Sequence, residues 1–180
     1  RSQHGEMSEA LFLTQGFVYD TAAAAEARFL GEDEGFIYAR YGNPTVRMFE
    51  ERMMALEGAE DAFATASGMA AVNAALFCQV KAGDHVIAAK ALFGGTDPDA
   101  WRAALRPETK VAFLESPSNP TLELIDIAQV AEIVHSVGAR LVIDNVFATP
   151  MYQRPLELGA DVVLYSATKH IDGQGRCLGG

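Results

Sequence analysis

Short apolar segments alternate with longer amphipathic segments along most of the chain. The apolar runs lie at residues 62–65, 85–88, 111–114, 141–143 and 162–165. Runs this short and this continuously apolar are typical of strands that are covered on both faces, and helices separate them in the sequence. We therefore predict an α/β fold with a mainly parallel sheet.

The clearest predicted helix begins at Asn43-Pro44, because Asn is a favoured N-cap and Pro suits the first helical position. Gly58 stands where a left-handed C-terminal cap belongs, and apolar residues recur between them at helical spacing, at Val46, Phe49, Met53 and Leu56. Further helices are predicted at 69–80 and 127–137. Residues 1–42 lack such a pattern, so we expect an irregular segment there.

Composition supports a folded domain. The chain has 180 residues, of which 49% are hydrophobic and 21% charged, so a disordered or fibrous protein is excluded. The 14 basic and 24 acidic residues give a net charge of −10, which is the wrong sign for a nucleic-acid or anionic-membrane binder. Any bound phosphate must therefore be held by local donors.

Two cysteines, Cys78 and Cys177, lack the paired spacing of a zinc site and the density of a disulfide scaffold. So few cysteines, at this spacing, fit a protein of a reducing compartment. No window approaches the ~18 apolar residues of a membrane span, and residues 1–5 lack a signal-peptide pattern. We expect a cytoplasmic protein with no nucleic-acid or membrane partner.

Three common motifs are rejected. Residues 173–179 resemble a dinucleotide-binding fingerprint, but Leu178 occupies the place of the third glycine. No lysine has the preceding glycine that a phosphate-binding P-loop requires. The four histidines are scattered, so we expect no metal site.

Lys169 follows the apolar run at 162–165. Partial desolvation at such a place lowers the pKa of a lysine and makes its amine available for Schiff-base chemistry with a carbonyl compound. The alternative is a lysine that simply extends to the surface. Ser166 and Thr168 flank it with hydroxyls that can donate to a phosphate, or that can instead serve in a cap or turn.

Asp144 ends the run at 141–143 and is predicted to face the same sheet edge as Lys169. A carboxylate there can keep a pyridine nitrogen protonated, although capping or a surface ion pair would also explain it. Gly68 and Met69 open a predicted helix, where free amides and the helix dipole favour a phosphate. A phosphorylated pyridine that bears a carbonyl group, pyridoxal 5′-phosphate (PLP), matches all three features.

The chain also resembles a known family, the PLP-dependent enzymes of Cys/Met metabolism, and within it the O-succinylhomoserine sulfhydrylases. The resemblance covers nearly all 180 residues and includes several motifs in one order: residues 38–45 (YARYGNPT), 66–71 (ASGMAA), 115–120 (ESPSNP), 144–145 (DN) and 166–175 (SATKHIDGQG). It implies the large domain of the aspartate-aminotransferase-like fold. It also implies that Lys169 carries the cofactor, that Asp144 pairs with the pyridine nitrogen, and that the phosphate binds to Gly68, Met69, Ser166 and Thr168.

The resemblance further implies that residues 1–42 contribute to a neighbouring subunit's active site. In that family Tyr38 and Arg40 would reach the neighbour's phosphate, so a homotetramer built of dimers is implied. A guanidinium suits bidentate phosphate binding, and a surface ion pair is the alternative for Arg40. Residues 43–180 would form the PLP-binding domain.

Two further residues bear on the substrate. Asn119 resembles a contributor to substrate-carboxylate binding, although an Asn-Pro turn explains it equally well. Phe93 corresponds to the aromatic residue that stacks on the cofactor ring. The γ-lyases often have a Tyr at this position, and Phe93 lacks its hydroxyl, which favours the sulfhydrylase branch of the family. The alternative is that Phe93 is an aromatic residue of the core.

The resemblance breaks off near Gly94-Gly95, as though on the order of twenty residues were missing between them. Family members also have a smaller C-terminal domain after the position of Gly180. We expect this chain to lack both parts.

The implied reaction is γ-replacement of O-succinyl-L-homoserine by sulfide, which gives homocysteine for methionine biosynthesis. Cystathionine γ-synthase and methionine γ-lyase are the alternatives within the family. An interaction domain that keeps the fold without catalysis is the alternative outside it.

Overall fold

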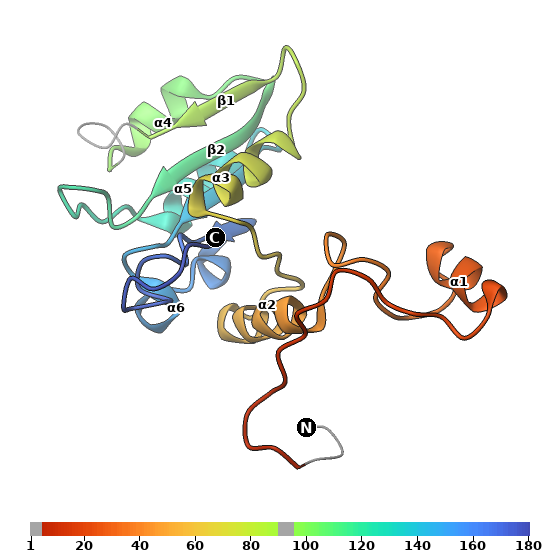
Figure 1. Cartoon of the computed structure of the whole chain (residues 1–180). Coiled ribbons are helices and arrows are strands. Elements are labelled where there is room, and N and C mark those ends of the chain that lie inside the picture. Colours follow the sequence, from red (N-terminus) through yellow and green to blue (C-terminus); the bar gives the residue numbers. More distant parts are fainter. Residues whose placement is uncertain (1–4, 90–95) are drawn as a thin grey trace. The chain divides into compact units, whose positions relative to one another are not determined.

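The structure, a computed structural model, describes residues 5–89 and 96–180 (Figure 1). The chain forms two compact units. The first comprises residues up to 55 together with 60–63, and the second comprises 56–59 together with 64–180. The second unit contains the sheet and most of the candidate site residues.

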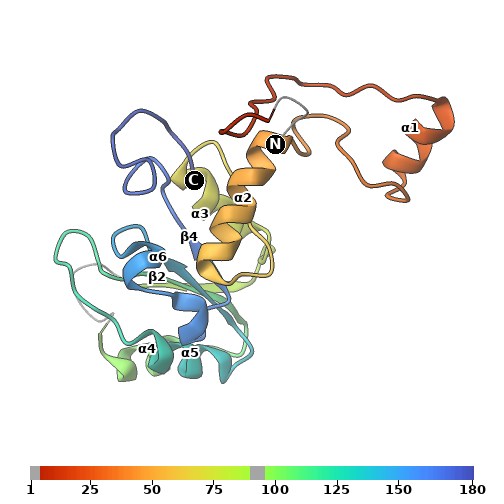
Figure 2. The ribbon, with the colours of Figure 1, turned by 90° about the horizontal axis from the view of Figure 1, so that it is seen from below.

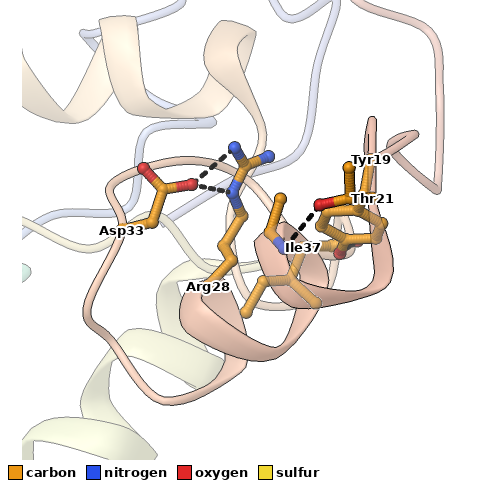
Figure 3. Close-up of polar contacts among 6 residues, drawn as sticks. Tyr19, Thr21, Arg28, Asp33 and Ile37 are labelled. Atoms are coloured by element: carbon orange, nitrogen blue, oxygen red, sulfur yellow. Dashed lines mark hydrogen bonds and ion pairs between the residues drawn. The ribbon is translucent and has the colours of Figure 1, made fainter.

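The first unit contains a helix that the sequence pattern did not predict. Helix α1 spans Ala22–Phe29, so the expectation of an irregular segment over residues 1–42 is wrong there. Its sequence, AAAAEARF, contains five alanines and a single large apolar residue, Phe29, so no row of large apolar side chains at helical spacing predicts it. Alanine propensity and local contacts stabilise it instead: Thr21 Oγ1 accepts from the Ala24 amide at 3.1 Å, and Arg28 pairs with Asp33 at 2.8 Å (Figure 3).

Helix α2 spans Pro44–Glu57, close to the prediction. The Asn43 side chain accepts from the Thr45 amide at 2.9 Å, and Gly58 follows the helix in the left-handed region, with φ of 67°. The predicted apolar face is not buried: Val46 and Leu56 are 41% and 45% exposed. The buried residue of α2 is Glu57, which belongs to the second unit.

The second unit is built on a four-stranded sheet. Its strands are β1 (His85–Ala88), β2 (Thr109–Glu115), β3 (Arg140–Asp144) and β4 (Val162–Leu164). They pair in chain order and all in parallel, which confirms the predicted fold class. The run at 62–65 is not a strand of this sheet, because Thr65 exchanges its two backbone hydrogen bonds with Gly180 (2.7 and 3.0 Å).

Helices cover both faces of the sheet (Figure 2). Helix α3 (Gly68–Phe77) packs on the face formed by Val111, Val142 and Leu164. Helices α4 (Pro98–Ala104) and α5 (Ile127–His135) cover the opposite face, where Leu114 and Ile143 lie. Since alternate residues of each strand face opposite sides, the continuously apolar runs match a sheet covered on both faces.

The chain returns from β3 to β4 through a short helix, α6 (Thr149–Tyr152), and a 3₁₀ turn, η1 (Pro155–Leu158). The carboxyl ends of β2, β3 and β4 consequently lie side by side at one edge of the sheet. Ligands of open α/β sheets bind at this edge.

Candidate active site

Three neighbouring strand ends bring the predicted site residues together. Glu115, the last residue of β2, is paired in register with Asp144, the last residue of β3. Asp144 is in turn paired with Leu164, the last residue of β4, and the chain then continues through Ser166 to Lys169. Sequence reasoning expected the acid and the amine to share one edge of the sheet, and the structure places both there.

The N-terminus of α3 lies directly against Ser166. A Cβ atom added to Gly68 would lie 2.7 Å from Ser166 Cβ, so only glycine permits this approach. Ser67 Oγ accepts from the Ala70 amide at 3.2 Å, while no carbonyl within the helix can reach the amides of Gly68 and Met69. Two free amides and a hydroxyl therefore lie close together, and such a donor set fits the phosphate of PLP.

Thr168 is engaged within the chain. Its Oγ1 accepts from the Gly179 amide at 3.0 Å and donates to the Gly179 carbonyl at 3.3 Å. To donate to a phosphate as the sequence suggests, this hydroxyl would have to give up the longer of the two bonds.

Lys169 lies in a turn over residues 167–172, five residues beyond the end of β4. Its side chain is exposed, so the expected partial desolvation is not found in the described chain, because the turn takes the residue away from the buried strand. Its Nζ nevertheless donates to Ser166 Oγ at 3.5 Å. The amine is thus held beside the hydroxyl that packs on α3.

Asp144 is half-buried, and burial raises the pKa of its carboxyl group to about 6. The hydrogen bond from the Val146 amide to Oδ1, at 3.0 Å, and the positive charge of Lys169 both lower this pKa, whereas the charge of Glu115 raises it. At neutral pH the group is therefore mostly ionised. A carboxylate poised in this way can hold a proton on a pyridine nitrogen.

The raised pKa predicts a pH-dependent stability change for Asp144→Asn. Because the folded state holds the proton more tightly than the unfolded chain, this carboxyl makes the free energy of unfolding fall as pH rises from about 4 to about 6. We expect the variant, without cofactor, to be more stable than the parent at pH 7.5 by roughly 1–2 kcal/mol after allowance for partial exposure. Denaturant unfolding at pH 4 and 7.5 checks this, and a gain of the same size at both values would contradict it.

The remaining predicted residues are not among the groups described above. Asn119 is exposed in the turn after β2, and its amide donates to Glu115 Oε2 at 3.0 Å. Tyr38 and Arg40 belong to the first unit, where the Arg40 guanidinium lies 5.5 Å from the centre of the Tyr38 ring. Phe93 lies outside the described residues.

Sequence reasoning missed a set of polar residues next to these strand ends, of which all but the half-buried Gln153 are buried: Glu57, Ser116, Asn145, Gln153 and Tyr165. Two signals could have indicated them. Asn145 directly follows the candidate acid, and Glu57 follows the apolar pattern of α2 at a position four residues after Met53. Neither signal shows which groups would meet.

Within residues 5–89 and 96–180, no helix is long and apolar enough to cross a membrane. The same residues contain no group of three or more His, Cys, Asp or Glu side chains that is placed to hold a metal ion.

A model of the Cys/Met metabolism PLP-dependent enzyme family matches residues 1–98 and 95–180. The chain belongs to this family. A PLP cofactor is therefore characteristic of its relatives, and the donor set described above fits that cofactor.

Curated relatives agree with the family. The chain is 53% identical over 201 aligned positions to an O-succinylhomoserine sulfhydrylase of Pseudomonas aeruginosa, with all of the chain and 50% of the relative covered. A Mycobacterium tuberculosis protein of the same name is 50% identical over the same coverage. An L-methionine gamma-lyase of Porphyromonas gingivalis is 40% identical over 98% of the chain and 50% of the relative. The chain thus spans about half the length of these relatives.

A solved structure supports the fold. A Campylobacter jejuni protein described as an O-acetylhomoserine (thiol)-lyase superposes with a TM-score of 0.91 at 29% identity. The match covers 98% of this chain and 49% of that one, and that protein carries a pyridoxyl-lysine monophosphate. The large-domain fold expected from the motifs is confirmed.

Proposed function

We propose that the protein containing this chain catalyses γ-replacement of O-succinyl-L-homoserine by sulfide, which yields homocysteine and succinate. One structural observation carries the proposal. The amine of Lys169, the hydroxyl of Ser166 and the free amides of α3 lie together at the sheet edge where Asp144 ends β3.

The chain's residues divide the binding of PLP between them. The amides of Gly68 and Met69, with Ser166 and Thr168, would hold the phosphate. Asp144 would hold a proton on the ring nitrogen, and Lys169 would hold the cofactor covalently until substrate arrives. When bound, PLP supplies an electron sink for a carbanion at the substrate Cα.

Lys169 then acts as the acid and base. Its amine takes the proton from the substrate Cα and next moves a proton at Cβ. The Cγ–O bond breaks with its electron pair on succinate, sulfide forms the new Cγ–S bond, and Lys169 returns the protons to Cβ and Cα. The exchange involves no net oxidation or reduction. The Ser166 hydroxyl, 3.5 Å from Nζ, keeps the amine at the phosphate end of the site.

The proposal also covers residues that would bind the substrate and residues that would act in a neighbouring subunit. Asn119 would contribute to the site that binds the substrate carboxylate. Its backbone amide donates to Glu115 Oε2, which holds the turn in place. Tyr38 and Arg40 would bind the phosphate of a neighbouring subunit in a cytoplasmic homotetramer. In support, Arg40 is exposed and forms no ion pair among the described residues.

The choice of sulfhydrylase rests on two observations. Relatives named O-succinylhomoserine sulfhydrylase reach 53% identity, whereas those named L-methionine gamma-lyase reach 40%. Phe93, which we assign to the ring-stacking position, has no hydroxyl for the proton transfer that a γ-lyase would need.

We also propose that about twenty residues belong between Gly94 and Gly95 in the intact protein. The alignment to the first relative supports this, since it runs over 201 positions against 180 residues in the chain, a difference of 201 − 180 = 21. The two segments of the family match also meet at residues 95–98.

The function is tested by trapping the cofactor and by comparing substrates. Borohydride reduction of the purified protein, followed by peptide mass spectrometry, should place a pyridoxyl group on Lys169. Turnover should be fastest with O-succinyl-L-homoserine plus sulfide. Faster turnover of O-acetylhomoserine than of O-succinyl-L-homoserine would mean that the substrate is the acetyl ester. Faster turnover with cysteine than with sulfide would favour a cystathionine γ-synthase. Release of thiol from methionine would favour a methionine γ-lyase. Absence of the pyridoxyl group would favour the non-catalytic alternative.

A further inference from the structure

A buried chain of polar groups runs behind the candidate site, through residues to which the proposed reaction assigns no role. Asn145 Nδ2 donates to the Tyr165 hydroxyl at 2.6 Å, and that hydroxyl donates to Glu57 Oε1. Asn145 Nδ2 also donates to the Gln153 carbonyl at 2.9 Å. We call Glu57, Tyr165, Asn145 and Gln153 the buried relay.

The direction of these hydrogen bonds is determined by the donors available. Both hydrogens of Asn145 Nδ2 are used, one of them on the Tyr165 oxygen, so the hydroxyl hydrogen of Tyr165 is directed to Glu57. Gln153 Nε2 likewise uses its two hydrogens on Asn145 Oδ1 at 2.8 Å and on the Ser116 carbonyl at 2.7 Å. Glu57 is therefore the acceptor at which the buried relay ends.

The buried relay joins the three strand ends that carry the site. Ser116 follows Glu115 at the end of β2, Asn145 follows Asp144 at the end of β3, and Tyr165 precedes Ser166 after β4. Each of the three residues that the relay contacts or contains is therefore the immediate neighbour in sequence of Glu115, Asp144 or Ser166.

The environment of the buried relay makes each of its bonds costly to lose. Ser116 and Asn145 are fully buried, and Glu57 and Tyr165 are 5% and 8% exposed. Glu57 Oε2 has no hydrogen-bond partner among the described residues, so this carboxyl occupies its place at an energetic cost. Burial raises the pKa of both Glu57 and Tyr165, while the charge of Arg154 lowers that of Glu57 and the charge of Glu157 raises it. The phenol accordingly remains a donor at physiological pH.

We propose that Glu57, through Tyr165 and Asn145, is a positioning residue that holds the ends of β2, β3 and β4 in register for cofactor binding. The inference rests on the proposed function, because it assigns the relay a role in placing Asp144 and the segment from Ser166 to Lys169. Glu57 and Tyr165 are separated by 108 positions in sequence, and their bond holds the phenol that accepts from Asn145. Without that bond the side-chain link between the chain after β4 and the end of β3 loses its anchor, and only the backbone bond from the Asn145 amide to the Leu164 carbonyl remains beside it. A shift of about 1 Å at reacting groups costs on the order of 100-fold in rate.

The test compares Tyr165→Phe, Glu57→Gln and Glu57→Leu in the intact protein loaded with PLP. Tyr165→Phe removes only the hydroxyl, and Glu57→Leu removes the acceptor, so both should weaken PLP binding about 10-fold and lower kcat about 10- to 100-fold. Glu57→Gln keeps an acceptor oxygen for Tyr165 and should stay within about 3-fold of the parent in both quantities. The dissociation constant of PLP, measured by fluorescence titration, is a readout that needs no substrate.

Tyr152→Phe is the matched control, since Tyr152 is an exposed tyrosine of α6 in the same unit. The inference is overturned if Tyr165→Phe binds PLP like the control, if it lowers only the unfolding temperature, or if Glu57→Gln is as defective as Glu57→Leu. A parent protein without a pyridoxyl group on Lys169 would overturn the proposed function. If the parent protein carries that group and the Tyr165→Phe variant binds as much PLP and is as active, only the positioning role of the buried relay is overturned.

Discussion

Replacing Lys169 by alanine should abolish the borohydride-trapped pyridoxyl group and lower kcat by about 10³-fold or more, because one amine both holds the cofactor and moves the substrate protons. The hydrogen-bond partner of Nζ, Ser166 Oγ, cannot replace the amine, because a hydroxyl forms no Schiff base and is not a base at neutral pH. Peptide mass spectrometry and initial rates with the succinyl ester and sulfide measure the two effects separately.

Lys81→Ala is the matched control, since Lys81 is an exposed lysine that precedes β1 in the same unit, at the opposite end of the strands from Lys169. It should retain the activity and the adduct of the parent. If Lys169→Ala kept a pyridoxyl group at another lysine together with full turnover, the assignment of Lys169 would be wrong.

Adding a single methyl group at Gly68 should weaken PLP binding on the order of 100-fold. The new Cβ would lie 2.7 Å from Ser166 Cβ and 2.9 Å from Ser166 Cα, and a backbone atom cannot move aside as a flexible side chain can. The N-terminus of α3 must therefore move away from Ser166, which separates the amides from the hydroxyl that together would hold the phosphate. Fluorescence titration of PLP with Gly68→Ala gives the dissociation constant.

Helix propensity offsets part of the strain that the clash causes, because alanine favours a helix over glycine by up to about 1 kcal/mol in a helix interior. Since Gly68 is the first residue of α3, this compensation is smaller here, and unfolding of the variant should be measured beside PLP binding. Asn73→Ala is the control, because Asn73 is an exposed residue in the middle of the same helix, away from its N-terminus, and this variant should bind PLP like the parent. Equal affinity of Gly68→Ala and Asn73→Ala would show that the approach of α3 to Ser166 does not form the phosphate site.

Prediction from the sequence was most successful where a residue's neighbours in the chain determine its structure. Pro44 and Gly58 bound α2 because proline suits a helix start and glycine suits a left-handed cap, and both effects are local. The four strands of the sheet were identified because burial on both faces requires continuous apolar runs. Helix α1 was missed because its apolar residues are alanines and Phe29, so no row of large apolar side chains marks it in the sequence.

The run at 62–65 was predicted as a strand because composition alone does not show whether a partner strand is available. The exposure of Lys169 was missed for a related reason. The sequence places it after a buried strand, but the turn over 167–172 determines how far from the sheet it lies.

The sequence by itself determined the family and the α/β class and supplied the candidate site residues, because motif order and apolar patterning are properties of the linear chain. Only the tertiary structure decided which groups meet: Gly68 with Ser166 across 98 positions of sequence, and Glu57 with Tyr165 across 108. Contacts of this kind depend on strand register and on helix packing. These are set by the burial of the whole sheet, so they cannot be inferred from any short segment.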